Sequence, residues 1–87
     1  MSTTQNFRSL SVIANEIRKN WNKETSGTEL YFGAKPYLSA MSTLDKITDN
    51  YYQDSADSIV RYFLCNATTW RGEVARRVKK ELNAMLK

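Results

Sequence analysis

The chain has 87 residues, of which 41% are hydrophobic and 25% charged, and its formal net charge is +4. This length supports one hydrophobic core, so we expect a single domain over residues 1–87. No run approaches the roughly 18 consecutive apolar residues of a membrane-spanning helix. The single cysteine, Cys65, and the absence of histidine exclude an internal disulfide, a His-based triad and most metal sites. We therefore expect no metal and no cofactor.

The N-terminal third predicts one helix followed by a loop. Residues 1–8 are mainly polar and are expected to be frayed. They contain no apolar signal-peptide core, so a cytoplasmic protein is expected. The first helix should begin at Ser9 or Ser11 and end at Trp21, because five apolar residues recur on one face: Leu10, Ile13, Ala14, Ile17 and Trp21. Residues 22–29 have no apolar side chain and predict an exposed loop.

A second helix is predicted in the middle of the chain. The segment 30–33 is apolar and aromatic, and we interpret it as the lead-in to this helix, with a two-stranded hairpin near residues 28–33 as the alternative. Pro36 is tolerated in a first helical turn. Tyr37, Ala40, Met41 and Leu44 then share a face, which places the end of the helix between Leu44 and Ile47. Residues 48–54 form a polar connection.

Two further helices complete the prediction. Asp54 or Ser55 can cap the third helix, whose buried face comprises Ala56, Ile59, Val60, Phe63 and Leu64. Residues 66–69 break the pattern, and Thr68 or Thr69 is expected to cap a fourth helix that reaches Leu86. A connection this short predicts an antiparallel hairpin of the last two helices. The expected fold is therefore all-α, a compact bundle of about four helices.

The fourth helix has one apolar and one cationic face. Residues 69–87 contain six Lys and Arg against two Glu, a difference equal to the net charge of the whole chain. Arg76 and Lys80 lie opposite the apolar sector, flanked by Arg77 and Lys79. This predicted cationic face, Arg76, Arg77, Lys79 and Lys80, is a candidate site for a phosphate backbone or an acidic protein. The alternative is a solvated helix surface in which Arg77 pairs with Glu73 and Glu81.

Arg71 falls inside the apolar sector of this helix, where an unpaired cation would be costly. Either the helix begins after Arg71, or the guanidinium is paired. The preceding acidic segment, residues 45–57, holds four aspartates against one lysine. We predict that Arg71 pairs with one of them: Asp45, Asp49, Asp54 or Asp57. The remaining possibility is that Arg71 takes part in recognition of a partner.

Aromatic residues are the other candidates for binding, because they can stack on bases or anchor a protein interface. The candidates are Tyr31, Phe32, Tyr37, Tyr51, Tyr52 and Tyr62. Tyr51 and Tyr52 lie in the polar connection, so at least one should be exposed. At helical spacing aromatics are more often core, which we expect for Phe32, Tyr37 and Phe63. Cys65 falls on the polar side of the third helix and is expected to be a plain thiol, because no histidine is present to activate it.

Two blocks of the sequence resemble known proteins of unsettled activity. They are YFGAKPYL at residues 31–38 and YFLCNATTWRGE at residues 62–73. Both are similar to small uncharacterised proteins encoded by phages and prophages of gut and lactic bacteria, and the likeness covers most of the chain after Ile13. The resemblance implies a viral context, in which proteins of this size often disable a host defence component, as anti-CRISPR proteins do.

The function expected from the sequence is therefore binding rather than catalysis. We expect a non-enzymatic phage protein that binds and inhibits a host protein or ribonucleoprotein, for example in a CRISPR–Cas system. The alternative is a small basic accessory protein that binds DNA or RNA directly. An enzyme is not expected, because the chain lacks histidine, credibly spaced carboxylate pairs and a phosphate-binding loop.

Overall fold

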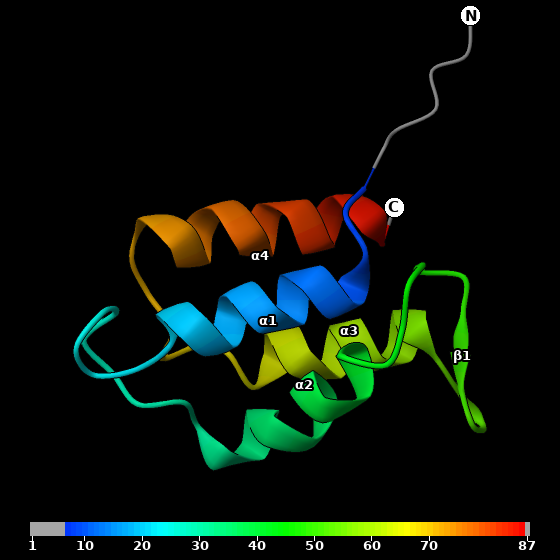
Figure 1. Ribbon diagram of the computed structural model, residues 1–87, viewed down its shortest axis with the longest axis horizontal. Coiled ribbons are helices and arrows are strands. Elements are labelled where there is room, and N and C mark those ends of the chain that lie inside the picture. The colour runs from blue at the N-terminus through cyan, green and yellow to red at the C-terminus, as the bar shows by residue number, and fades with distance from the viewer. Residues whose placement is uncertain (1–6, 87) are drawn as a thin grey trace, which may run out of the picture.

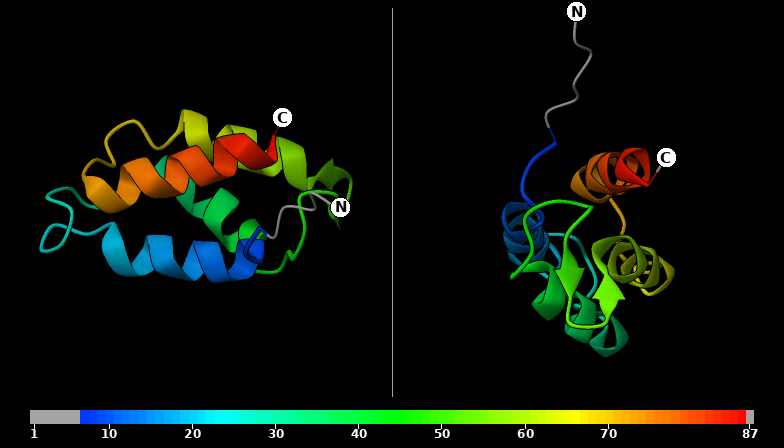
Figure 2. Two further views of the ribbon diagram at one scale, coloured as in Figure 1. Left: turned by 90° about the horizontal axis from the view of Figure 1, so that it is seen from above. Right: turned by 90° about the vertical axis from the view of Figure 1, so that its right-hand side faces the viewer.

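The structure of the chain is a computed structural model that describes residues 7–86. Its elements in chain order are α1 (Leu10–Asn20), the 3₁₀ helix η1 (Phe32–Ala34), α2 (Lys35–Met41), β1 (Asn50–Tyr51), β2 (Asp54–Ser55), α3 (Ala56–Cys65) and α4 (Glu73–Met85). Seen from its end, the molecule shows α1, α2, α3 and α4 arranged around one interior (Figure 2, right). No helix within residues 7–86 is both long and apolar enough to cross a membrane.

The predicted helical bundle is confirmed, but the fold is not purely all-α. Residues 50–55 form a two-residue antiparallel hairpin in which Asn50 pairs with Ser55. It projects at one end of the bundle, beside the label β1 in Figure 1. The turn was not predicted because Tyr52 takes a positive φ of 55°, a conformation usually adopted by glycine or asparagine. Residues 28–33, the expected position of any hairpin, contain no strand.

Two serines define the starts of α1 and α3: Ser9, where the sequence allowed Ser9 or Ser11, and Ser55, where it allowed Asp54 or Ser55. The Ser9 hydroxyl accepts a hydrogen bond from the Ser11 amide, and Ser55 does the same for Ser58. Each bond satisfies one amide that has no partner within the first helical turn. Asp57 lies in the first turn of α3, where its negative charge complements the helix dipole.

The second helix ends earlier than predicted. It runs only to Met41, whereas the apolar pattern placed its end between Leu44 and Ile47. The Ser42 and Thr43 hydroxyls donate hydrogen bonds to the Ser39 and Ala40 carbonyls, and such side-chain bonds compete with continued helix. Leu44 is nevertheless buried, because the turn after α2 still directs it into the core.

The last helix begins at Glu73, so the predicted caps at Thr68 and Thr69 are wrong. Its N-cap is Gly72, whose φ of 110° is rarely accessible to residues with a side chain. This turn allows Trp70 to be fully buried before the helix starts. As predicted, α3 and α4 run in opposite directions (Figures 1 and 2). However, more of the α4 backbone lies near α1 than near α3.

Three aromatic rings join the ends of α1, α3 and the connection before α4. Trp21 and Trp70 stack with ring centroids 5.6 Å apart and planes 15° from parallel. The Phe63 ring meets both indoles edge-on. Both indole nitrogens also have partners, since Trp70 donates to the Asn20 side chain at 2.8 Å and Trp21 donates to Thr28 at 3.2 Å. These contacts hold residues 66–72 against the C-terminal end of α1.

Candidate partner-binding surface

Helix α4 is held by its apolar face. Four residues on that face are buried: Ala75, Val78, Leu82 and Met85. Arg76, Arg77 and Lys80 are exposed, as the helical periodicity predicted. Because the buried face prevents the helix from rotating, these cations are presented to solvent in a constant orientation.

The exposed Arg77 nevertheless forms an ion pair with another residue of the chain. Its guanidinium donates to the carboxylate of Glu16 on α1, not to Glu73 or Glu81 as predicted. Glu81 instead pairs with Arg8, whose Nη2 also lies 2.8 Å from Glu16. The predicted pairs within the helix are replaced because α1 lies alongside α4 and brings Glu16 within reach of Arg77, while Glu81 is paired with Arg8.

This ion-pair chain, Glu81–Arg8–Glu16–Arg77, shifts the titration of its members. The hydrogen bond from Arg77, together with that from Arg8, lowers the pKa of Glu16 below its ordinary value. The pKa of Arg8 is raised, chiefly by its hydrogen bond to Glu81. Arg8 belongs to the segment 1–8 that was predicted to be frayed, and this prediction is wrong for Arg8. Residues 1–6 lie outside the described part of the chain.

Lys79 is also occupied by an internal contact. Its Nζ donates to the Trp70 carbonyl at 2.7 Å and lies 6.0 Å from the centroid of the Trp70 ring. Burial lowers the pKa of Lys79, and the nearby charge of Arg71 lowers it further. The ammonium therefore satisfies a carbonyl in the connection before α4. Within the predicted cationic face, Arg76 and Lys80 are the two exposed cations for which the described residues supply no carboxylate.

The predicted pairing of Arg71 with an aspartate is wrong. Arg71 precedes the helix, so it does not follow the helical spacing that placed it in the apolar sector, and its side chain is exposed. The aspartates of the acidic segment have local roles or face solvent. Asp49 accepts the amides of Asp45 and Lys46, which lowers its pKa, and Asp57 pairs with Arg61.

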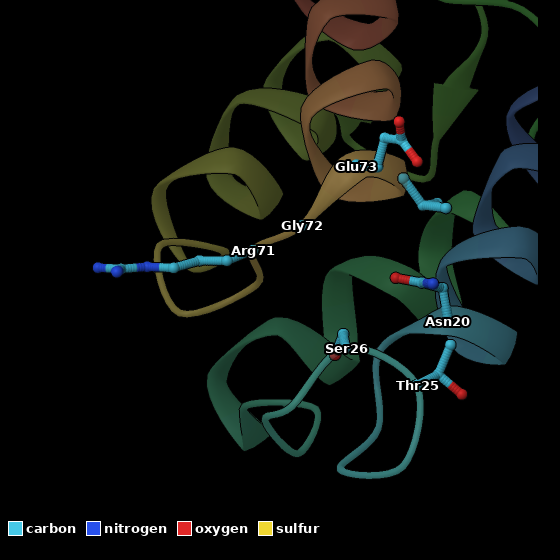
Figure 3. Close-up of a pocket in the computed structure, with 7 residues that line it drawn as sticks. Asn20, Thr25, Ser26, Arg71, Gly72 and Glu73 are labelled. Carbon is cyan, nitrogen blue, oxygen red and sulfur yellow. The ribbon is translucent and has the colours of Figure 1, made fainter.

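A pocket of about 190 Å³ lies where α4 begins. Its lining comes from the end of α1, the following loop and the first turn of α4: Asn20, Thr25, Ser26, Arg71, Gly72, Glu73 and Val74. Figure 3 shows the Arg71 side chain extending away from this pocket, and the carboxylate of Glu73 at its other side. The Asn20 side chain already accepts the Trp70 indole N–H. The pocket therefore lacks a cation directed inward that could hold an anion.

The hairpin carries the two predicted tyrosines. Tyr52 is 88% exposed and Tyr51 is half-buried, which confirms that one of the pair faces solvent. Their rings meet edge-on with centroids 4.7 Å apart. The hairpin and the connection that contains Arg71 lie at opposite ends of the bundle (Figure 1). The seven predicted binding residues therefore do not converge on one site.

A second group of rings, also named among the aromatic candidates for binding, lies at the surface. Phe32 was expected in the core but is 74% exposed, and Tyr37, also expected there, is only half-buried. The expectation for Phe63 is confirmed. Tyr31 and Tyr62 are exposed as well. We call these four residues the aromatic surface: Tyr31, Phe32, Tyr37 and Tyr62. The sequence held one indication that Phe32 is exposed: it precedes Pro36 and so lies outside the periodic apolar pattern of α2.

No protein-family profile, curated protein sequence or solved structure was found to match the chain. Among residues 7–86 there is no group of three or more His, Cys, Asp or Glu side chains arranged to hold a metal ion.

Proposed function

We propose that this chain is a non-enzymatic binding protein that engages a host protein or ribonucleoprotein through the outer face of α4. The observation that carries the proposal is the pair Arg76 and Lys80. Both side chains are exposed, they lie one helical turn apart, and the described residues give neither a carboxylate partner. A partner with an acidic surface fits this face by charge.

Two features support the outer face of α4 rather than the whole positive end of the chain. Arg77 and Lys79 have internal partners, so an approaching acidic group would compete with Glu16 or with the Trp70 carbonyl for them. Arg76 and Lys80 have no such competition. The helix that presents them is anchored by its buried face, so little backbone conformational entropy is lost when a partner binds.

The proposed role of this binding is inhibition of a host defence system, such as CRISPR–Cas. It follows from the resemblance of residues 31–38 and 62–73 to small phage and prophage proteins. The positive charge implies that the chain does not imitate the acidic backbone of DNA. Instead, an acidic or phosphate-bearing surface of the host component would be covered.

Direct binding to DNA or RNA through the same face is the second candidate, because the chain has a net charge of +4 and an isoelectric point near 9.4. The two candidates differ in their dependence on salt. Phosphate contacts release condensed counterions, so affinity for bare nucleic acid falls steeply as ionic strength rises. Affinity for a protein with a partly apolar interface falls less.

The test is capture of the partner from host lysate on the immobilised chain, with and without nuclease. The variant Arg76→Glu/Lys80→Glu should lose the partner. The matched control Lys19→Glu/Lys46→Glu makes the same change in net charge at two exposed lysines elsewhere and should retain it. Equal capture by both variants would exclude the α4 face as the site. Loss of capture on nuclease treatment would favour the nucleic-acid candidate.

The defence role has its own measurement. Expression of the chain in cells whose CRISPR–Cas system targets a phage should restore plaque formation, and the Arg76→Glu/Lys80→Glu variant should not. If the unmodified chain leaves plaque numbers unchanged against the targeted phage, inhibition of that system is excluded, whatever the capture experiment shows.

A further inference from the structure

The aromatic surface is presented in a defined arrangement. Tyr31 and Phe32 have ring centroids 5.0 Å apart and planes 56° from parallel, and Phe32 remains 74% exposed beside Tyr31. Tyr37 on α2 and Tyr62 on α3 form a second pair 5.7 Å apart. Asn66 lies between the segments that carry the two pairs. Its side-chain amide donates to the backbone carbonyl of Tyr62, and its Oδ1 lies close to Gly33. The two ring pairs therefore lie on segments that adjoin at Gly33 and Asn66.

Gly33 provides the space for this arrangement. A Cβ at this position would lie 2.5 Å from the Tyr31 ring and 3.0 Å from the Asn66 side chain. The backbone of Gly33 is helical, so its conformation does not itself require glycine. Glycine within a helix costs about 0.5–1 kcal/mol relative to alanine. The chain accepts this cost at a position where the benefit is the placement of an exposed ring.

Near these rings one positive charge, that of Lys35, has no carboxylate partner within residues 7–86. Lys35 is exposed, follows the Phe32–Ala34 turn directly and has no carboxylate partner among the described residues. The carboxylates nearest in the chain are neutralised by partners, Glu29 by Lys23 at 3.4 Å and Asp57 by Arg61 at 2.7 Å. An uncompensated lysine close in the chain to exposed aromatic rings favours a phosphate-bearing ligand over a protein, because lysine is depleted in protein interfaces.

We propose that the aromatic surface binds single-stranded nucleic acid, with a base stacked on Phe32 and an adjacent phosphate contacted by Lys35. Every base has a flat face that can stack on an exposed ring, so this mode tolerates any sequence but requires unpaired bases. The net charge of +4 attracts such a polyanion to the chain. This surface is separate from Arg76 and Lys80, and the inference does not depend on the function proposed for α4.

The experiment measures fluorescence anisotropy of labelled oligo(dT) and oligo(U) strands of about 12 nucleotides at low salt. The unmodified chain should bind both strands, and a duplex of the same length should compete poorly because its bases are paired. Phe32→Ala should weaken binding about tenfold, the loss expected for one stacked base. Lys35→Gln should reduce the slope of log affinity against log salt by about 0.7, the contribution of one phosphate contact in a single strand.

Gly33→Ala tests the placement of the ring rather than its presence. The added methyl must displace Tyr31, so binding should weaken while the circular-dichroism spectrum stays helical. Tyr52→Ala is the control, because it removes an exposed ring of the hairpin that lies outside the aromatic surface, and it should leave binding unchanged.

Three results would overturn the proposal. The first is absence of binding by the unmodified chain at low salt, and the second is equal binding by the Phe32→Ala variant. The third is loss of binding in Arg76→Glu/Lys80→Glu with full binding in Lys35→Gln, which would place the strand on α4. The first two results leave the function proposed for α4 untouched, because capture after nuclease treatment reports a protein partner. The third would favour the nucleic-acid candidate for α4.

Discussion

Arg8 and Glu81 are 73 positions apart in the chain and are joined by two parallel hydrogen bonds. Arg8 Nε donates to Oε2 at 3.1 Å and Nη2 donates to Oε1 at 2.7 Å. Such bidentate pairs are among the stronger ionic contacts in proteins. Because Glu16 also contacts both Arg8 and Arg77, this one chain of charges connects the segment before α1, α1 itself and α4.

Replacement of Arg8 should therefore destabilise the fold. Arg8→Ala removes the central cation of the ion-pair chain. It leaves Glu81 without its arginine partner and Glu16 with Arg77 alone. We expect a loss of about 1 kcal/mol in the free energy of unfolding, since the pairs are partly exposed to solvent. Urea denaturation measures it. The control Arg18→Ala removes an exposed arginine that donates a hydrogen bond to Ser39 and has no ion pair within residues 7–86, so it should change stability by less than about 0.5 kcal/mol. Equal losses would show that the ion-pair chain adds no stability.

The lowered pKa of Glu16 predicts that the free energy of unfolding depends on pH. Its pKa in the folded state is lowered from 4.5, mainly by the hydrogen bond from Arg77. A carboxyl group with a lowered folded pKa contributes stability above its unfolded pKa and loses that contribution as pH falls through the folded value. Stability should therefore decrease below about pH 4.5.

The variant Glu16→Gln isolates this contribution. It should be less stable than the unmodified chain at pH 7 and more nearly equal to it at pH 3, when denaturation is followed at both values. A constant difference across this range would mean that Glu16 does not titrate differently in the folded and unfolded states.

The indole stack predicts the largest effect of a single substitution. Trp21 is buried, stacks on Trp70 and meets Phe63 edge-on. Trp21→Ala should cost about 3–5 kcal/mol through lost burial and the cavity left behind. For a domain of this size the loss should abolish the cooperative thermal transition followed by circular dichroism. Trp21→Phe keeps a ring and should retain the transition at a lower midpoint. A normal melt of the alanine variant would contradict the central role of the stack.

Cys65 provides a direct check on the phase of α3. The residue is exposed, as its position on the polar side of the helix predicted. The thiol of native protein should therefore react with a chromogenic thiol reagent at a rate close to that of the urea-denatured chain. Protection of the native thiol would show that α3 is rotated or that a second molecule covers this side of it.

The sequence alone was sufficient for features that depend on neighbours in the chain. The starts of α1 and α3 are determined by Ser9 and Ser55, whose hydroxyls bond to amides two or three residues ahead. The buried face of α3 follows from apolar residues repeated at helical spacing, since a helix places such residues on one side whatever they pack against. The exposure of Arg76, Lys80 and Cys65 follows from the same periodicity.

Only the tertiary structure decided which distant groups meet. Arg77 contacts Glu16 rather than its helical neighbours because α1 lies beside α4, and no local pattern encodes that packing. The helical wheel placed Arg71 in the apolar sector wrongly, because Trp70 is buried against Trp21 and α4 starts only at Glu73. Phe32 is exposed because η1 begins before the periodic part of α2. In each case the deciding energy comes from burial or charge contacts between segments far apart in the chain, which local periodicity does not report.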